Sequence, residues 1–376
     1  MHERPSTSES VGFSSAPTAQ RATADGTARL AARHVAKRDA DFFRASSAEL
    51  TLSSLGIGTY LGECTDAEDE RYVEALREAM RSGINVLDTA INYRCQRSER
   101  AVGAALAGAI AAGEVRRDEI VVCSKAGYIP LDGAPPVKRS EYEAYLEREF
   151  FASGVLSRDD VVGGGHSLSP TFLAYAMARS RSNLGVATID VFYLHNPEQQ
   201  IGSVATDVLR ARLRDAFRTL EEAVSRGDVA AYGVATWAGL RVTAGTKGHL
   251  SLGDVVSAAR DVAGDGHHLR FVQLPLNLAM PEAVRTPTQK LGAERVVPAI
   301  VAATELGLTV VASATLMQGK LTHGLPSAVQ SLFPRARSDA ERALAFAREA
   351  PGVTTALVGM RSDAHVRANV TAASRR

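Results

Sequence analysis

Residues 188–195 read TIDVFYLH, a mostly apolar run that ends in a histidine. Two earlier stretches have the same form: residues 84–90 read INVLDTA, and residues 119–125 read EIVVCSK. Apolar runs of this length, with polar residues toward their ends, are typical of strands buried in a parallel sheet. We therefore expect three neighbouring strands whose polar end residues gather at one edge of the sheet.

Segments with helical periodicity separate these runs, and several of them stop at a glycine. Strands that alternate with helices pair in parallel through right-handed crossovers, and eight such units favour a closed barrel over an open sheet. We predict a (β/α)8 TIM barrel. Its strands are expected at residues 52–60, 84–90, 119–125, 188–195, 231–236, 269–276, 309–314 and 354–360. Its helices are expected at residues 68–82, 98–112, 169–184, 207–226, 252–262, 297–306, 339–349 and 363–373.

Two connections are longer than ordinary loops: residues 126–168 after the third strand, and residues 279–293 after the sixth. Both follow strands, so both belong to the barrel face that carries active sites. For the first loop two alternatives stay open: a wall or lid of the pocket, or a solvent-facing excursion packed on its own aromatic residues. Those aromatic residues are Tyr128, Tyr142, Tyr145, Phe150 and Phe151.

Composition narrows the function classes. The 376 residues carry 43 basic and 42 acidic side chains, a balance that argues against a partner in nucleic acid or at a membrane surface. Three cysteines, no apolar run of about 18 residues and no secretory-signal profile favour a cytoplasmic protein. Residues 1–45 are poor in large apolar groups, so we expect them to be disordered and residues 46–376 to form the barrel. Monomer and small homo-oligomer both stay open.

Four polar residues at or near consecutive strand ends form a chemically coherent set: Asp88, Tyr93, Lys125 and His195. Each alone has an ordinary structural explanation, such as a helix cap or a satisfied histidine. Together, a lysine beside the phenol lowers the tyrosine pKa from about 10, and a carboxylate keeps that lysine charged. The tyrosine then exchanges a proton, and a histidine N–H stabilises an oxyanion. A hydride must come from a cofactor.

This pattern resembles the aldo/keto reductase superfamily of NADPH-linked carbonyl reductases, over about residues 50–370. The resemblance implies that Asp88, Tyr93, Lys125 and His195 are the family's catalytic tetrad, with the tyrosine as proton donor. Members that reduce carbon–carbon double bonds replace the histidine, and its presence here favours carbonyl chemistry.

The resemblance also implies residues that hold the nicotinamide end of NADPH. In GVATW, Thr236 stands near the position of the family's polar pair after the fifth strand, and Gln273 in FVQLPLN matches the glutamine on the sixth. Ser313 stands where the family usually has a tyrosine that stacks on the nicotinamide ring. This departure puts cofactor affinity in question.

The segment LVGMRSDAHVRAN, residues 357–369, resembles the family's binding segment for the adenosine phosphate. Arg361 in this segment is suited to bind a 2′-phosphate. The alternative is a helix start with a solvated arginine. No GxGxxG fingerprint follows the first strand, which argues against a Rossmann dinucleotide site. His267 and His268 are adjacent, so they are not spaced as a metal-ligand pair. We therefore expect no metal. The cofactor residues of this segment are predicted to be Gly359, Met360, Arg361, Ser362, His365 and Asn369.

The resulting hypothesis is an NADPH-dependent reductase of aldehydes, ketones or sugar-like carbonyls. Two alternatives stay open: a sugar or polyol dehydrogenase acting mainly in the oxidative direction, and a nucleotide-sensing binding protein with slow turnover.

Overall fold

The computed structural model describes residues 20–292 and 294–374, and its centre is a closed barrel of eight parallel strands. The strands are β3 (Leu55–Gly58), β4 (Val86–Asp88), β5 (Val121–Ala126), β6 (Ile189–His195), β7 (Val229–Ala235), β8 (Leu269–Pro275), β11 (Thr309–Ser313) and β12 (Val353–Gly359). Each strand pairs with the next one in this list, and β12 pairs with β3 to close the ring. The predicted (β/α)8 TIM barrel is confirmed.

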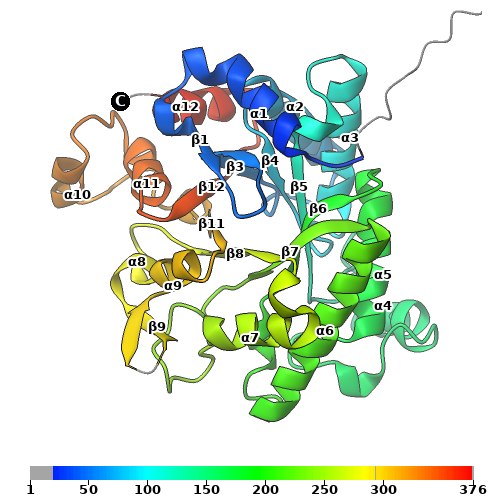
Figure 1. The fold of residues 1–376 in the computed structure, drawn as a ribbon. Coiled ribbons are helices and arrows are strands. Elements are labelled where there is room, and N and C mark those ends of the chain that lie inside the picture. The colour runs from blue at the N-terminus through cyan, green and yellow to red at the C-terminus, as the bar shows by residue number, and fades with distance from the viewer. Residues whose placement is uncertain (1–19, 293, 375–376) are drawn as a thin grey trace, which may run out of the picture.

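Helices follow the strands and surround the barrel (Figure 1). They are α2 (Asp66–Arg81), α3 (Arg97–Ala111), α5 (Pro170–Leu184), α6 (Thr206–Arg226), α7 (Leu252–Ala263), α9 (Ala299–Glu305), α11 (Asp339–Arg348) and α12 (Asp363–Ala373). Local sequence sets their ends: Thr65 and Ser169 accept hydrogen bonds from backbone N–H groups of the first turns of α2 and α5. Gly185 and Gly227 end α5 and α6 in the left-handed conformation.

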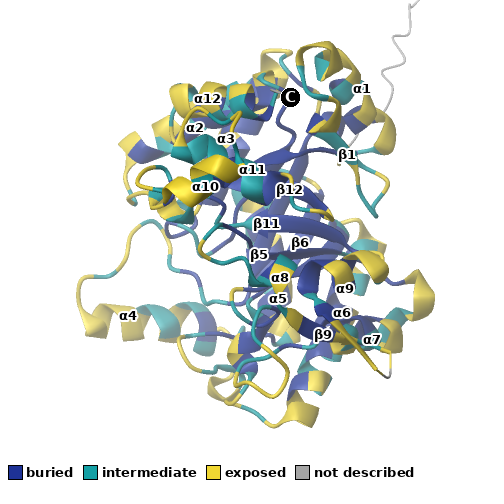
Figure 2. Ribbon diagram, turned by 90° about the vertical axis from the view of Figure 1, so that its left-hand side faces the viewer, coloured by how far each residue is buried: buried dark blue, intermediate teal, exposed yellow. Residues whose placement is uncertain are grey.

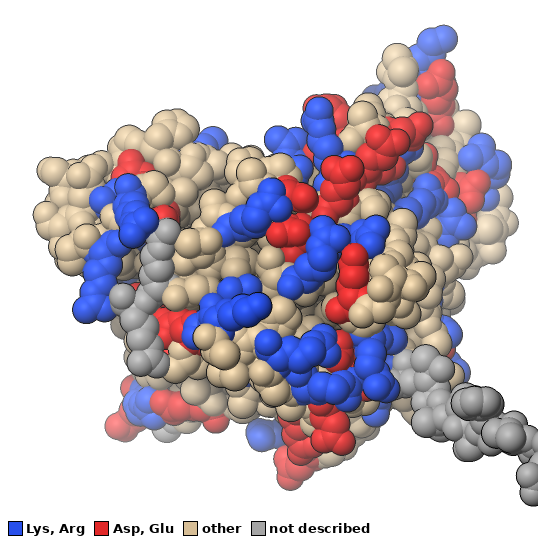
Figure 3. Space-filling model, turned by 90° about the horizontal axis from the view of Figure 1, so that it is seen from above, with Lys and Arg blue, Asp and Glu red and all other residues tan. Residues whose placement is uncertain are grey.

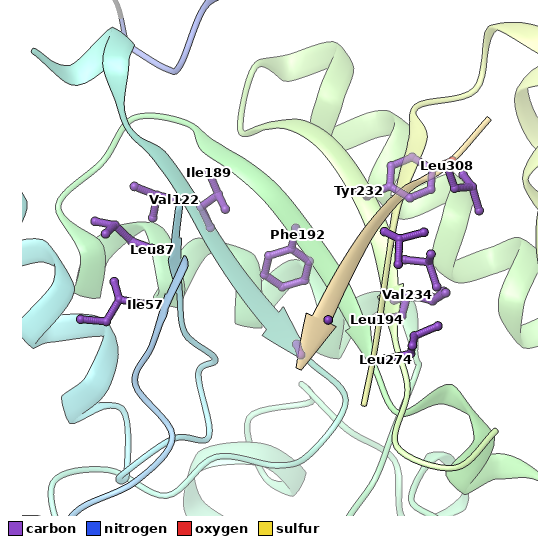
Figure 4. Close-up of a cluster of buried hydrophobic side chains, with 14 of the residues drawn as sticks. Ile57, Leu87, Val122, Ile189, Phe192, Leu194, Tyr232, Val234, Leu274 and Leu308 are labelled. Carbon is purple, nitrogen blue, oxygen red and sulfur yellow. The ribbon is translucent and has the colours of Figure 1, made fainter. Parts of the chain in front are cut away.

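Side chains alternate between the two faces of each barrel strand. In β5, Val122 belongs to the apolar cluster between barrel and helices, whereas Val121 and Cys123 belong to a second cluster inside the barrel. Figure 4 shows part of the outer cluster, including Leu87 and Phe192. Because the site residues of β4, β5 and β6 share the parity of the inner cluster, their side chains belong to the inside of the barrel.

The segment before the barrel is folded where the structure describes it. Residues 20–45 contain α1 (Ala24–His34), the short 3-10 helices η1 (Val35–Lys37) and η2 (Ala40–Phe42), and β1 (Phe43–Ala45), which pairs antiparallel with β2 (Thr51–Ser53). Arg29 and Arg33 of α1 form ion pairs with Glu119, whose side chain is fully buried. The expectation of disorder over residues 1–45 is therefore wrong for residues 20–45; residues 1–19 lie outside the described residues.

This error has a physical reason. Leu30 and Phe42 are fully buried, so the segment contributes apolar contacts despite its polar composition. Ion pairs and backbone bonds complete the docking, including a 2.6 Å bond from the Ala22 N–H to the buried Asp190 carboxylate. Composition counts apolar residues but does not show charges that meet partners far along the chain.

The two predicted long connections contain secondary structure of their own. The first holds α4 (Arg139–Leu146), a π-helical turn at Glu147–Phe151 and a 3-10 turn at Arg158–Asp160. The second holds α8 (Glu282–Arg285) and β9 (Pro287–Leu291), which pairs with β10 (Arg295–Pro298). The helix predicted at residues 297–306 therefore starts two residues late, as α9. A further short helix, α10 (Ser327–Leu332), precedes α11, and Figure 2 shows α4 and α10 largely exposed.

No helix within residues 20–292 and 294–374 is long and apolar enough to cross a membrane. On the face seen in Figure 3, basic and acidic side chains are interspersed.

Candidate active site

The predicted tetrad comes together at the carboxyl end of the barrel. Asp88 is the last residue of β4, Lys125 lies near the end of β5, and His195 is the last residue of β6. Tyr93 lies in the turn that leads from β4 to α3. The three strands are consecutive neighbours in the barrel, which is why residues up to 107 positions apart in the sequence face one interior space.

Lys125 is at the centre of the set. Its side chain is fully buried, and its ammonium donates to Asp88 Oδ1 at 2.6 Å, to the Thr89 carbonyl at 2.8 Å and to the Tyr93 hydroxyl at 3.4 Å. Burial is the largest single effect and lowers the pKa of Lys125, but the Asp88 charge, Tyr93 and the hydrogen bond to Asp88 together outweigh burial, so the pKa of Lys125 is raised. The lysine is therefore a fixed positive charge beside the phenol.

Asp88 is held on both carboxylate oxygens. Lys125 donates to Oδ1, and the Gln273 side-chain amide donates to Oδ2 at 2.8 Å from the opposite side of the barrel. The Gln273 amide also lies close to the buried Tyr193 hydroxyl. The carboxylate thus has no freedom to rotate, and it neither caps α3 nor faces solvent.

Tyr93 lies between three side chains. Its ring contacts Tyr60 at a centroid distance of 5.1 Å and His195 at 5.7 Å, both edge-on, and the Lys125 ammonium lies 4.9 Å from its ring centroid. Burial raises the pKa of the Tyr93 hydroxyl, and the opposing effect of Lys125 is smaller. The expectation of a lowered tyrosine pKa is therefore wrong. Desolvation of the phenolate outweighs the nearby cation, so the hydroxyl keeps its proton.

His195 is a neutral histidine. Burial, with the Lys125 charge next in size, lowers its pKa well below the ordinary range. Its ring lies perpendicular to Tyr128, at a centroid distance of 5.2 Å, and its buried Nδ1 has no hydrogen-bond partner among the described residues. A neutral imidazole carries one N–H donor, which suits a carbonyl oxygen better than an anion.

A second histidine holds the backbone of the first. His166 Nε2 donates to the His195 carbonyl at 2.8 Å, while Gln200 donates to His166 Nδ1 at 2.8 Å. Arg212 donates to the Gln200 side-chain oxygen, which fixes the orientation of that amide. Gly127 packs so closely that a Cβ there would lie 2.3 Å from the His195 carbonyl oxygen. The sequence analysis did not identify His166 as a site residue, because only the fold shows its contact with the His195 carbonyl.

Glu198 was also missed by sequence reasoning. Its Oε1 accepts hydrogen bonds from the backbone N–H groups of Trp237, Ala238 and Gly239, at 2.6 to 3.3 Å. Its position three residues after His195 was the only sequence signal. The carboxylate thereby fixes the backbone of the segment that follows β7, and the side chain of Trp237 in that segment is half exposed.

Three predicted cofactor residues lie at the ends of the next strands. Thr236 follows β7, and its buried hydroxyl has no partner among the described residues. Gln273 is engaged with Asp88, and Ser313, the last residue of β11, is partly buried. A buried hydroxyl without a partner fits the amide of a nicotinamide ring, because it would gain the hydrogen bond that it lacks.

The segment predicted to bind the adenosine phosphate runs from the end of β12 into α12. Ser362 caps α12 by accepting from the His365 N–H at 3.3 Å, and Met360 is fully buried in the core. Arg361 is half exposed, and its guanidinium donates to the buried Glu68 carboxylate of α2 at 2.9 Å. The helix start and the arginine fit an anion, but Glu68 competes for that arginine. Gly359 is exposed at the strand end, His365 is exposed and Asn369 is partly buried, both on α12.

Both alternatives for residues 126–168 hold in part. Tyr128 packs against His195 and His166 and accepts a 3.0 Å hydrogen bond from Asn196, so it is a wall of the site. Tyr145 and Phe150 pack on each other, and Phe150 packs on Phe172 and Tyr175 of α5, away from the tetrad. The distal part of this connection is therefore an excursion anchored by its own aromatic residues.

Comparison with known proteins agrees with this geometry. The profile of the Aldo/keto reductase family matches residues 54–252. A D-threo-aldose 1-dehydrogenase from Pseudomonas is 30% identical over 193 residues, which cover 50% of this chain and 52% of that protein. An NADH-specific methylglyoxal reductase from Escherichia coli is 27% identical over 192 residues, covering 50% and 49%. The matched region thus spans about half the length of these curated relatives.

Solved structures share the fold. An aldo/keto reductase from Klebsiella pneumoniae, in complex with NADP and acetate, superimposes with a TM-score of 0.58 at 21% identity, over 89% of this chain and 90% of that one. A glycerol dehydrogenase from Gluconobacter oxydans gives a TM-score of 0.60 at 19% identity, over 90% and 91%.

Proposed function

The chain belongs to the aldo/keto reductase family of oxidoreductases, and on that premise we propose that it transfers a hydride between NADPH and an aldehyde, ketone or sugar-like carbonyl. The observation that carries the proposal is the Lys125 ammonium, which contacts both the Asp88 carboxylate and the Tyr93 hydroxyl inside the barrel. The four tetrad residues take the roles of proton donor, tuning pair and carbonyl-orienting group.

Tyr93 gives its proton to the carbonyl oxygen during reduction. Its raised pKa keeps the hydroxyl protonated at neutral pH, as a general acid requires. The phenolate that remains is stabilised by the Lys125 charge, which Asp88 holds in place. In the oxidative direction the same phenolate takes the proton of an alcohol.

His195 orients the carbonyl. Because its imidazole is neutral, it donates one N–H without competing with Tyr93 as an acid. Two donors, the phenol and the imidazole, stabilise the oxygen as negative charge develops on it. The Gly127–His166 support behind His195 keeps the donor in position.

NADPH, when bound, supplies the hydride. We propose that Thr236, Gln273 and Ser313 hold its nicotinamide end. Thr236 is the best supported of the three, because its buried hydroxyl lacks a partner among the described residues. The adenosine phosphate would lie along the β12–α12 connection and the first two turns of α12, at Gly359, Met360, Arg361, Ser362, His365 and Asn369, and Met360 would contribute only its backbone because its side chain is buried.

The test starts with fluorescence titrations of the purified protein with NADPH and, separately, NADH. Carbonyl reduction is then compared for the native protein, Tyr93→Phe and the matched control Tyr60→Phe, whose ring lies 5.1 Å from Tyr93. We expect Tyr93→Phe to lose about 10²–10⁴-fold in turnover with nearly unchanged dinucleotide affinity. Tyr60→Phe should keep most of its activity. Absence of dinucleotide binding, or full turnover in Tyr93→Phe, overturns the proposal.

A second candidate is a sugar or polyol dehydrogenase that runs mainly in the oxidative direction, which the name of the Pseudomonas relative favours. Rates measured in both directions with the same substrate pair discriminate the two. Tight dinucleotide binding with negligible turnover over the whole panel would instead support a nucleotide-sensing binding protein.

The proposed setting is the cytoplasm, as a monomer or small homo-oligomer with a small-molecule substrate and no nucleic-acid or membrane partner. The net charge of +1 supports the part of this proposal that excludes a nucleic-acid or membrane partner. The face seen in Figure 3 mixes acidic and basic side chains and has no broad basic surface.

A further inference from the structure

Two of the three cysteines of the chain meet beside the active site. Cys64 lies in the connection between β3 and α2, and Cys95 lies in the turn between Tyr93 and α3. The Cys64 thiol lies close enough to the Cys95 thiol to raise the pKa of Cys95, an effect that adds to that of burial. The third cysteine, Cys123, is buried inside the barrel on β5.

Neighbouring bonds hold the two cysteine-bearing segments together independently of the thiols. The residue before Cys95 is Arg94, whose buried guanidinium donates twice, at 2.9 and 2.7 Å, to the carbonyl of Glu63, the residue before Cys64. The same guanidinium pairs with Asp69 of α2 at 2.5 Å. This arrangement fixes the backbone of each cysteine against the other.

The turn that carries Cys95 is strained and fixed from a second side. Arg94, Cys95 and Gln96 have φ values of 47°, 53° and 68°, three consecutive non-glycine residues in the left-handed region. The Cys95 carbonyl accepts from the Gly133 N–H at 3.0 Å, and the Gln96 amide donates to the Leu131 carbonyl at 3.1 Å. A cysteine held in this way loses little further freedom when it is cross-linked.

We propose that Cys64 and Cys95 form a reversible dithiol–disulfide pair, which peroxide oxidises to a cross-link between the β3–α2 and β4–α3 connections at the mouth of the site. Cys64 is partly exposed and is the thiol that an oxidant reaches, whereas Cys95 is 8% exposed. Cys123 is buried among apolar side chains and stays reduced.

The chemistry proceeds in two steps. The Cys64 thiolate attacks one peroxide oxygen, the O–O bond breaks, and Cys64 becomes a sulfenic acid while hydroxide leaves and takes up a proton to form water. The Cys95 thiolate then attacks the Cys64 sulfur, the S–O bond breaks and a second water leaves. Two thiols are oxidised by two electrons, and one peroxide is reduced to two waters. Burial raises the pKa of Cys95 to about 12, so the second step is the slower one.

The cross-link also acts on Tyr93, which lies two residues before Cys95. Two neighbouring free thiols must approach further to reach the S–S bond length of about 2 Å, and this approach would shift the turn that carries both Cys95 and Tyr93. A displacement of about 1 Å at a catalytic group is enough to slow an enzyme strongly. This consequence rests on the proposed function, whereas formation of the disulfide does not.

The experiment oxidises the reduced full-length protein with hydrogen peroxide and counts thiols after denaturation. We expect one of the three thiols to remain, a Cys64–Cys95 peptide to appear in mass spectra without reductant, and dithiothreitol to restore all three. Cys95→Ser should accumulate a sulfenic acid at Cys64 that dimedone traps, and Cys64→Ser should form no intramolecular cross-link. Retention of all three thiols, a cross-link only between molecules, or reaction at Cys123 overturns the proposal.

The rate readout is separate. Carbonyl reduction by the cross-linked protein should be at least about 10-fold slower and recover with dithiothreitol, and Cys64→Ser should be insensitive to the same treatment. Unchanged turnover in the cross-linked protein overturns the coupling to Tyr93. A protein that forms the disulfide but binds no dinucleotide contradicts the proposed function alone.

Discussion

The side-chain amide of Gln273 donates a 2.8 Å hydrogen bond to Asp88 Oδ2 across the interior of the barrel. Since Lys125 donates to the other oxygen, both acceptors of the Asp88 carboxylate are engaged, and all three side chains are buried. Gln273 therefore belongs to the charge network of the tetrad. To hold a nicotinamide amide as well, it would have to use the donor or acceptor of its own amide group that Asp88 does not occupy.

Gln273→Met tests which role dominates. The change leaves one Asp88 oxygen without a donor, so we expect the free energy of unfolding to fall by about 1–3 kcal/mol. If Gln273 acts through Asp88, the single-turnover reduction rate falls while the NADPH dissociation constant changes little. The control is Thr236→Val, whose hydroxyl has no hydrogen-bond partner among the described residues. It should weaken dinucleotide binding instead. A large loss of affinity in Gln273→Met with a normal rate would contradict the network role.

The pH dependence of reduction should lack a step near neutrality. Reduction needs the protonated phenol, and burial raises the pKa of Tyr93 above its ordinary value of about 10. The rate therefore falls only as pH rises through that raised pKa. His195 stays neutral over the same range, because its pKa is lowered by burial and by Lys125. Single-turnover rates from about pH 6 to about pH 9 should be flat, and a midpoint near 7 would contradict these assignments.

The sequence predicted the barrel and the common location of Asp88, Lys125 and His195 for one physical reason. Period-two alternation puts Asp88, Lys125 and His195 on the inner parity of consecutive parallel strands, and parallel strands bring their carboxyl ends to one rim. The alternation along a strand and the shared rim of parallel strands both follow without knowledge of any long-range contact.

What the sequence did not predict depends on such contacts. The His166–Gln200 support, the Glu198 cap on Trp237 and the docking of α1 join segments that no local pattern relates. The sign of the Tyr93 pKa shift also needed the structure, because spacing shows a nearby lysine but not the extent of desolvation.

Glu68 should set the preference between NADPH and NADH. Its carboxylate, with a side chain 5% exposed, pairs with Arg361 at 2.9 Å and neutralises the guanidinium proposed to bind a 2′-phosphate. Glu68→Gln removes that charge. The backbone N–H of residue 68 still donates its hydrogen bond to the Thr65 hydroxyl, which caps α2. We expect NADPH to bind about 10-fold more tightly, a gain of about 1.4 kcal/mol, with NADH nearly unchanged.

The matched variant for this prediction is Arg361→Met, which should weaken NADPH binding about 10-fold and leave NADH binding nearly unchanged. Dissociation constants from fluorescence titration give both results without turnover. An equal change for both dinucleotides in Glu68→Gln would show that the pair acts on the fold and not on the 2′-phosphate.

His166 links stability to pH. Burial lowers its pKa to about 4, against about 6.5 in an unfolded chain. Above pH 6.5 neither state binds the proton, so the hydrogen bonds to His195 and Gln200 are fully available. Between pH 6.5 and 4 the unfolded chain takes up a proton that the folded protein excludes, so stability falls as pH falls, by about 2 kcal/mol at pH 5.

Urea unfolding of the native protein and of His166→Gln, at about pH 7 and about pH 5, measures this loss of stability. The native protein should lose about 2 kcal/mol more than the variant between the two pH values, because the variant has no imidazole to protonate. A stability difference between the two proteins that stays constant with pH would mean that folding does not lower the pKa of His166, and would contradict its burial as a neutral imidazole.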